Sequence, residues 1–193
     1  ADERYIFASN HPLGGLDGML LVDALIERFG DAGAVVNDLL MNISYLEPLW
    51  IPINKYGKQS AEKGRRYDEA FSSPTKQVLT LPAGFCSRYI DGRVQDIEWR
   101  SHFVKDALRY NRKIVPVFVE GTLSKRFYRI YRLRRFLHLN VNLELVLLVD
   151  EMFRQRGNHI HIRVGAPVDV ATLEGSRGDI CKEIRRRAYA LER

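Results

Sequence analysis

Cysteine is scarce in this 193-residue chain, which carries only Cys86 and Cys181. The two lie far apart and form no Cys-x-x-Cys pair, so we expect neither a disulfide framework nor a zinc ribbon, and a reducing compartment suits the chain. Long apolar runs are also missing. Uncharged apolar stretches such as residues 145–149 are short, whereas a helix that spans a bilayer requires roughly 20 apolar residues. The sequence therefore predicts no membrane-spanning helix.

The first residues contain no secretory signal, because the charged Asp2, Glu3 and Arg4 run directly into the apolar residues 5–8. The chain also lacks an initiator Met and reaches a core-like strand at once. We therefore expect it to be part of a longer protein, in which a membrane anchor or a partner domain would precede these residues.

Composition indicates one folded domain. Hydrophobic residues make up 46% of the chain and aromatic residues 10%, which excludes general disorder and allows one sizeable core. No internal repeat, low-complexity tract or linker-like segment divides the sequence. We expect residues 1–193 to form a single domain.

Short apolar runs alternate with segments of helical periodicity, which indicates an α/β domain. Several runs are apolar at every position, as in strands that are covered on both faces. We predict a mostly parallel or mixed central sheet flanked by helices. The predicted strands are residues 4–9, 34–37, 49–54, 77–81, 114–119, 145–149 and 159–164. The predicted helices are residues 16–29, 38–46, 58–71, 96–110, 123–138 and 178–191.

The formal net charge of +6 favours an anionic partner: nucleic acid, an anionic lipid surface or an acidic carrier protein. The charge is concentrated in residues 125–135, which hold six basic residues and no acid. On a helical wheel, apolar residues including Phe127, Leu133 and Leu137 share one side, which is typical of a helix lying on an anionic membrane. A core helix with a solvated charged face has the same pattern. The basic side consists of Lys125, Arg129, Arg132 and Arg135.

The strongest chemical signal follows the first predicted strand. His11 stands just after the strand end, Gly14 and Gly15 form a turn, and Asp17 opens the next helix. Ligands of open α/β sheets bind at the carboxyl ends of the strands, and His is the usual general base near neutral pH. An acid across the turn would fix the tautomer and stabilise the imidazolium. A turn histidine beside a helix-capping aspartate would give the same pattern.

Two weaker motifs follow later strands. In residues 81–88, Pro82 and Gly84 predict a tight loop whose amides would face an anion, with Ser87 and Arg88 as donors. Residues 51–55 form a strand that ends in Lys55, a candidate phosphate ligand. An ordinary strand-to-loop transition and a solvated strand end are the alternatives.

Together these segments resemble the glycerolipid acyltransferases, the superfamily that includes lysophosphatidic acid acyltransferase. The stretch from Asn10-His11 to Asp17 resembles the family's His-to-Asp catalytic motif. Residues 51–55 stand where the family has a strand ending in an acceptor-binding Arg, and residues 81–84 match its Phe-Pro-Glu-Gly loop. Residues 114–117 match its Pro-containing strand. Within the superfamily the chain is most similar to the hemolysin and ornithine-lipid acyltransferase branch.

The chain departs from the family pattern at several positions. Five residues separate His11 from Asp17, where most of the superfamily has four. The glycine pair in the turn accommodates the extra residue, so we expect direct contact between the two side chains. Lys55 replaces an Arg, and Ala83 replaces the usual Glu. These changes favour an acceptor with a head group other than glycerol phosphate.

The resemblance implies a glycerol-3-phosphate acyltransferase-like fold and acyl transfer to a hydroxyl of a lysolipid, either lysophosphatidic acid or a lyso-amino-acid lipid. His11 would deprotonate the hydroxyl with support from Asp17. The alkoxide would then attack the thioester of acyl carrier protein (acyl-ACP) or coenzyme A (acyl-CoA), with amides near Gly84 stabilising the oxyanion. The implied substrate-binding residues are Asn10, Lys55, Pro82, Gly84, Ser87 and Arg88. No bound cofactor or metal is expected, and the implied location is peripheral, on the cytoplasmic face of the inner membrane.

Three alternatives remain open at this point. Cys86 would be a rival nucleophile if its thiolate lay near His11, although Cys is often a small buried apolar residue. The same two interpretations, nucleophile or structural residue, apply to Ser9 and Ser87. The chain would also fit a non-catalytic, basic membrane-binding protein of the hemolysin type. Charge alone suggests a nucleic-acid-binding module, but zinc-finger spacing, an RNA-binding signature and a recognition helix are missing, so we expect no nucleic-acid partner.

Overall fold

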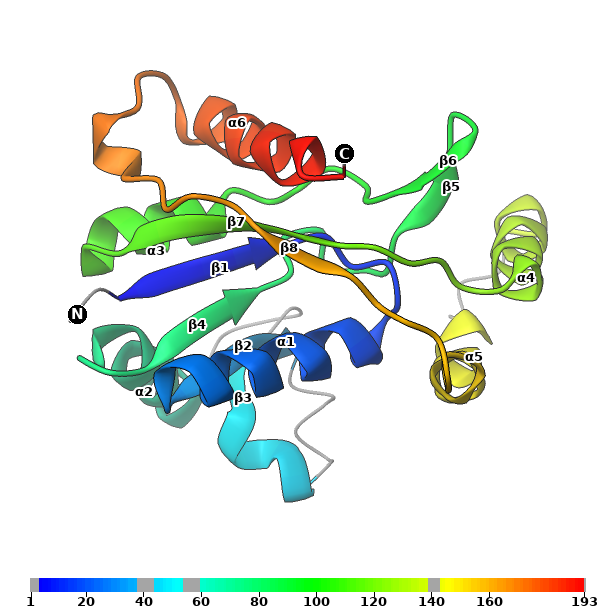
Figure 1. The fold of residues 1–193 in the computed structure, drawn as a ribbon, viewed down its shortest axis with the longest axis horizontal. Coiled ribbons are helices and arrows are strands. Elements are labelled where there is room, and N and C mark those ends of the chain that lie inside the picture. The colour runs from blue at the N-terminus through cyan, green and yellow to red at the C-terminus, as the bar shows by residue number, and fades with distance from the viewer. Residues whose placement is uncertain (1–3, 38–43, 54–59, 139–142, 193) are drawn as a thin grey trace.

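The computed structural model describes residues 4–37, 44–53, 60–138 and 143–192 and has a six-stranded sheet at its centre (Figure 1). The order across the sheet is β3-β2-β4-β1-β7-β8. The β7–β8 pair is antiparallel and the other pairs are parallel, which confirms the predicted mixed, mostly parallel sheet flanked by helices. The strands are β1 (Tyr5–Ser9), β2 (Ala32–Asn37), β3 (Trp50–Ile53), β4 (Gln77–Thr80), β7 (Lys113–Val119) and β8 (Ile162–Val164).

Helices cover both faces of the sheet because successive side chains of a strand point to opposite sides. In β1, Phe7 belongs to the hydrophobic cluster that includes residues of α1 (Gly15–Phe29), whereas Ile6 and Ala8 belong to the cluster on the other face. The helices contributing to that second cluster are α2 (Ala61–Ser72), α3 (His102–Tyr110) and α6 (Arg177–Ala190). Two buried faces explain why these strands are apolar at nearly every position.

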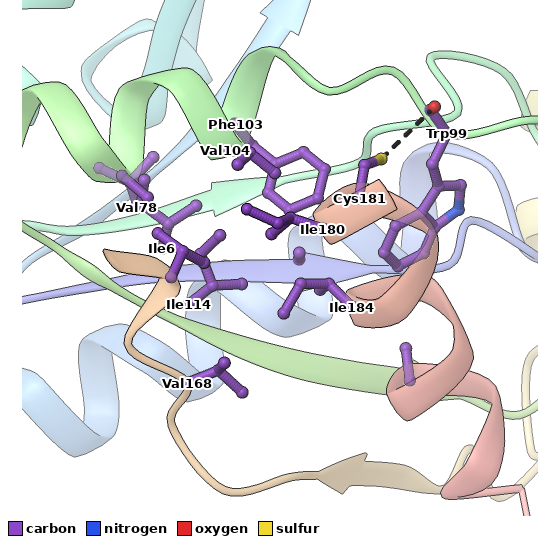
Figure 2. Packing of buried hydrophobic residues seen from close by; sticks show 14 of the residues in the cluster. Ile6, Val78, Trp99, Phe103, Val104, Ile114, Val168, Ile180, Cys181 and Ile184 are labelled. Atoms are coloured by element: carbon purple, nitrogen blue, oxygen red, sulfur yellow. Dashed lines mark hydrogen bonds between the residues drawn. The ribbon is translucent and has the colours of Figure 1, made fainter. Parts of the chain in front are cut away.

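Figure 2 shows the cluster between the sheet and helices α3 and α6. Ile6, Val78 and Ile114, from three neighbouring strands, are fully buried. Each such side chain contributes roughly 1.5–3 kcal/mol through removal from water. Trp99 lies at one end of this cluster, where its carbonyl oxygen accepts a hydrogen bond from the Cys181 thiol at 3.5 Å. The core therefore continues up to the segment that precedes α3.

The carboxyl ends of β1, β4 and β7 lie at one edge of the sheet (Figure 1). Two further helices, α4 (Lys125–Phe136) and α5 (Leu143–Arg154), lie side by side beyond that edge. The segment after β1 with His11 and the loop after β4 therefore meet on the side of the sheet where α/β proteins bind ligands.

One element prediction is wrong. The predicted strand at residues 145–149 lies inside helix α5, because a short apolar run is compatible with either element and only its longer context decides. The predicted helix at residues 38–46 lies partly outside the described residues, and Ser44–Leu49 form the short 3-10 helix η2, which contains Pro48.

The predicted helix at residues 96–110 begins only at His102. It is preceded by a hairpin of β5 (Arg88–Ile90) and β6 (Arg93–Gln95), whose turn residues Asp91 and Gly92 have φ values of 49° and 81°. Asp-Gly is a typical pair for a two-residue hairpin turn, since both positions require positive φ. The predicted strand at residues 159–164 is likewise shorter, and a 3-10 turn η3 (Val170–Thr172) follows it.

Among the helices of the described ranges, none is both long and apolar enough to cross a membrane.

Arg112 connects several elements at the opposite edge of the sheet. Its buried guanidinium donates hydrogen bonds of 2.8–3.3 Å to the carbonyl oxygens of Tyr5, Ala70, Phe71, Ser73 and Lys76. Three of these carbonyls belong to the end of α2, where helical partners are lacking. Burial, with a smaller contribution from the charge of Arg4, lowers the pKa of Arg112 to about 10. The side chain thus remains charged at neutral pH.

We expect Arg112→Met to lower the free energy of unfolding by about 3 kcal/mol, because five carbonyl groups, in two buried and three partly buried hydrogen bonds, lose a charged donor. Urea unfolding followed by circular dichroism measures this change. Arg65→Met, on the exposed face of α2, is the control and should stay within about 0.5 kcal/mol of the parent chain. Equal stabilities of the two variants would contradict the role given to Arg112.

Candidate active site

Asn10 fixes the point at which the chain leaves β1. Its side-chain nitrogen donates to the carbonyl of Val119 at 2.9 Å, and its oxygen accepts from the Val119 amide at 2.7 Å. These two bonds join the carboxyl ends of β1 and β7. Asn10 was predicted to bind substrate, but it is buried and its polar atoms bond the protein. We therefore assign it to positioning the next residue, His11.

His11 and Asp17 contact each other directly, as predicted. The distance between His11 Nδ1 and Asp17 Oδ1 is 2.7 Å. Asp17 is fully buried, and its oxygens also accept the backbone amides of Leu13 and Gly18, each at 2.8 Å. Gly14 adopts a φ of 69° in the turn between them, a conformation that favours glycine. The turn thereby accommodates the additional residue between His11 and Asp17.

The geometry of this pair sets the protonation pattern of the imidazole. A carboxylate at Nδ1 accepts a hydrogen bond from that nitrogen, so the neutral ring carries its hydrogen on Nδ1 and its lone pair on Nε2. The His11 side chain is 15% exposed. A basic nitrogen therefore lies at the edge of the sheet where ligands bind.

A second carboxylate, Asp96, holds the same turn and was not found from the sequence. Its Oδ1 accepts the His11 amide at 3.1 Å and the Ser87 hydroxyl at 2.5 Å. Its Oδ2 accepts the indole N–H of Trp99 at 2.8 Å. Ser87 in turn donates its amide to the His11 carbonyl at 2.7 Å. One buried carboxylate thus joins the segment after β1, the loop after β4 and the core.

Helix α6 holds the backbone of Asp96. The Tyr189 hydroxyl accepts the Asp96 amide at 2.8 Å, and the Arg185 guanidinium donates to the Asp96 carbonyl at 2.9 Å. The sequence gives little indication that Asp96 belongs to the site, because an acid at the start of a predicted helix is usually a capping residue. The Asp-Gly pair at residues 91–92 is the signal that could have been used: it predicts a hairpin that ends just before Asp96, so that Asp96 need not begin a helix.

The charges around His11 favour its protonated form. Burial alone would lower the pKa of the imidazole, but the Asp17 and Asp96 carboxylates together outweigh it, so the pKa is raised above 6.5. Arg88 opposes this rise. Burial also raises the pKa of Asp96, against the hydrogen bonds from Ser87 and Trp99. The site is therefore arranged to stabilise positive charge on the ring when it takes up a proton.

The backbone groups of the loop after β4 form hydrogen bonds with other backbone groups of the protein. The Gly84 amide donates to the Leu81 carbonyl at 2.9 Å in a turn where Gly84 has a φ of 66°, and the Pro82 carbonyl accepts the Arg100 amide at 3.1 Å. The Gly84 amide, expected to stabilise an oxyanion, is therefore committed to the turn. Pro82 and Gly84 shape the loop that carries Ser87.

Arg88 joins this loop to helix α4. Its guanidinium is buried, donates to the Cys86 carbonyl at 2.7 Å, and lies 4.5 Å from the centre of the Tyr131 ring. The ring of Phe127 is 5.5 Å away. These cation–π contacts hold α4 against the site, and the arginine is close enough to His11 to affect its pKa.

Cys86 does not have the properties of a nucleophile. Burial, with the nearby Asp17 charge, raises the pKa of its thiol to about 12, whereas a reactive cysteine requires a low pKa. Its sulfur packs against the turn between His11 and Asp17, 3.3 Å from the position that a Cβ on Gly14 would occupy. We interpret Cys86 as a small packing residue.

The remaining predicted site residues lie elsewhere. Lys55 lies outside the described residues. Lys125, Arg129, Arg132 and Arg135 are exposed on α4, as predicted. The opposite side of that helix differs from the prediction, because Phe127 is buried whereas Leu133 and Leu137 are exposed. Within the described ranges, no group of three or more His, Cys, Asp or Glu side chains is placed to hold a metal ion.

We expect Asp17→Asn to lower the pKa of His11, because burial then acts on the imidazolium with one carboxylate fewer. NMR titration of the His11 ring measures the change, with Asp23→Asn, an exposed position on the same helix, as the control. The raised pKa of His11 also predicts a pH-dependent stability. The His11–Asp17 pair adds most to the free energy of unfolding below pH 6.5, and this contribution is lost as the pH rises through the raised pKa. An unchanged His11 pKa in Asp17→Asn would contradict this account.

Comparison with known proteins places the chain among acyltransferases. A family model described as acyltransferase matches residues 1–193. A lyso-glycine lipid O-acyltransferase of Bacteroides thetaiotaomicron is 37% identical over 174 residues, which cover 90% of this chain and 64% of that protein. A protein of the same name from Phocaeicola vulgatus is 37% identical over 172 residues, covering 89% and 61%.

The chain thus spans less than two thirds of the length of these relatives. The family match nevertheless extends over all of its residues, including the turn with His11 and Asp17. It confirms the resemblance to glycerolipid acyltransferases inferred from the motifs. The chain belongs to this acyltransferase family.

Proposed function

We propose that this protein is an O-acyltransferase that moves a fatty acyl group from a thioester to a hydroxyl of a lysolipid in membrane lipid biosynthesis. The observation that carries the proposal is the 2.7 Å contact between His11 and the buried Asp17. It leaves a basic nitrogen at the ligand-binding edge of an acyltransferase-family fold. The relatives named for transfer to lyso-glycine lipid support the same reaction class.

In the proposed reaction, Nε2 of His11 accepts the proton of the acceptor hydroxyl as that oxygen attacks the thioester carbonyl. A carbon–oxygen bond forms, and the carbonyl electrons move to its oxygen. Collapse of this intermediate breaks the carbon–sulfur bond, and the departing thiolate takes the proton from the imidazolium. The ester and the free thiol are the products, and His11 returns to its neutral form.

The two carboxylates have distinct roles in this proposal. Asp17 bonds Nδ1, fixes the ring orientation and stabilises the imidazolium directly. Asp96 bonds the His11 amide and acts on the ring through charge and position. The raised pKa makes His11 a stronger base toward the acceptor hydroxyl.

The proposed acceptor is a lyso-amino-acid lipid, with lyso-glycine lipid as the leading candidate and lysophosphatidic acid as the alternative. The names of the two relatives support this order. The donor is acyl-ACP or acyl-CoA, and the net charge of +6 suits either an acidic carrier protein or a phosphate-bearing thiol. We propose a peripheral position on the cytoplasmic face of the inner membrane, where lysolipid and donor meet.

A non-catalytic membrane-binding protein is the second candidate, and the basic helix α4 favours it. Such a protein has no use for a buried carboxylate aimed at an imidazole nitrogen, because burying a charge is costly without a functional or structural partner. A catalytic test at His11 therefore separates the two.

We expect His11→Ala to lower the rate of acyl transfer by about 10²–10⁴-fold, the contribution typical of a general base. Labelled acyl-ACP and acyl-CoA are offered in turn, with lyso-glycine lipid, lyso-ornithine lipid and lysophosphatidic acid as acceptors. His159→Ala, an exposed position, is the control and should transfer at the parent rate. Transfer that survives in a folded His11→Ala protein would overturn the proposed mechanism.

A further inference from the structure

The second half of α4 exposes large apolar side chains. Leu133 is 58% exposed and Phe136 79%, and Leu137 at the end of the helix is 51% exposed. Their spacing places them on one face of the helix. Phe127 in the first half is fully buried in the core. The helix thus changes from a core element to an apolar surface along its length.

Exposed cations accompany these apolar residues. Arg129, Arg132 and Arg135 are exposed on the same helix. Asp150 of α5 pairs with Arg126 at 3.7 Å, in the first turn of α4. We call Leu133, Phe136 and Leu137, together with Arg129, Arg132 and Arg135, the α4 patch. Apolar side chains interspersed with arginines complement an anionic lipid surface, whose head groups attract the cations while its acyl layer accepts the apolar groups.

The beginning of α4 is fixed to the domain. Ser124 caps the helix, accepting the Phe127 amide at 3.3 Å, and the Ser124 amide and hydroxyl bond the buried Glu151 of α5 at 2.6 and 2.5 Å. Tyr131 stacks with the Arg88 guanidinium at 4.5 Å. The helix is therefore anchored at its first half and presents its second half outward, as a docking element requires.

Helix α4, which carries the patch, is connected to the candidate active site through Arg88, whose guanidinium lies over the rings of Phe127 and Tyr131. Arg88 bonds the carbonyl of Ser87 at 3.3 Å, and Ser87 bonds the backbone of His11. On the α5 side, Leu148 lies 2.9 Å from the position of a Cβ on Gly14 in the catalytic turn. Both helices lie beyond the carboxyl ends of the strands (Figure 1). A membrane bound at α4 would therefore lie on the same side of the domain as His11.

From these observations we propose that the α4 patch docks the protein on an anionic membrane, with Leu133, Phe136 and Leu137 entering the acyl layer and the three arginines bound to lipid head groups. The inference deepens the proposed function, on which it rests for the lysolipid substrate. Docking through α4 presents the acceptor to His11 from the membrane itself.

Sedimentation with vesicles tests docking without any substrate. The vesicles contain phosphatidylcholine, alone or with about a third phosphatidylglycerol to supply negative charge. A variant carrying Leu133→Ser, Phe136→Ser and Leu137→Ser should bind the anionic vesicles at least about tenfold more weakly, because the inserted apolar groups are lost. A variant carrying Arg129→Gln, Arg132→Gln and Arg135→Gln should bind anionic vesicles on the order of a hundredfold more weakly, with no change in its binding to uncharged vesicles.

A matched control carries Leu108→Ser and Arg65→Gln. Leu108 is a 45% exposed apolar residue of α3, a helix that lies toward the other end of the sheet in Figure 1, and Arg65 is an exposed arginine of α2. The control should bind vesicles like the parent chain. Vesicle binding that is equal in the serine variant and the parent, or absent in the parent, would overturn the proposal. If the patch variants bound acyl carrier protein more weakly but bound vesicles like the parent chain, the patch would be assigned to the carrier protein instead.

The same variants separate this proposal from the proposed reaction. Transfer is measured with lyso-glycine lipid in anionic vesicles and with the same lipid dispersed in detergent. The serine variant should lose transfer at least about tenfold on vesicles and keep the parent rate in detergent, where docking is not needed. Vesicle binding without transfer in either medium would leave docking intact and reject the acyltransferase reaction.

Discussion

The buried carboxylate of Asp96 is the interaction on which the site depends. It accepts three hydrogen bonds, from the His11 backbone, the Ser87 hydroxyl and the Trp99 indole. Each donor comes from a different segment, so one side chain sets the relative positions of the histidine turn, the loop after β4 and the core. Burying an acid is costly unless it is fully hydrogen-bonded. Here the free-energy cost of burying the Asp96 carboxylate is offset by its three hydrogen bonds, and these bonds hold the backbone of His11 in place.

The rest of the site follows from that constraint. With its backbone held by Asp96 and Asn10, His11 can present Nδ1 to Asp17 and keep Nε2 for a substrate. The same carboxylates raise the pKa of His11 against the effect of burial. At Cys86, in the same loop as Ser87, burial and the Asp17 charge raise the pKa more than Arg88 lowers it, and the thiol stays protonated. The same surroundings thus favour the charged form of His11 and the neutral form of Cys86.

Much of this arrangement could be predicted from the sequence, and the failures have physical causes. Strands buried on both faces are apolar at most positions, so β1 and β7 were found from their apolar runs, and the turn between His11 and Asp17 was recognised from its residues. The strand predicted at residues 145–149 was wrong because a short apolar run does not reveal its period. Asp96 was missed because it stands at the start of a predicted helix, where an acid is read as a cap, and because its contact with His11 joins residues 85 positions apart. The exposed apolar face of α4 could not be distinguished from a core face, since a helical wheel shows which residues share a side but not what covers them.

The most direct test of the account is acyl transfer by Asp96→Asn, measured across pH together with its unfolding free energy. Asparagine preserves the shape but removes the charge that acts on His11. We expect a folded protein with a lower kcat and a rate profile whose acidic limb, where the rate rises as His11 loses its proton, moves to lower pH because the pKa of His11 falls. A folded Asp96→Asn protein with the parent kcat and the parent pH profile would contradict it.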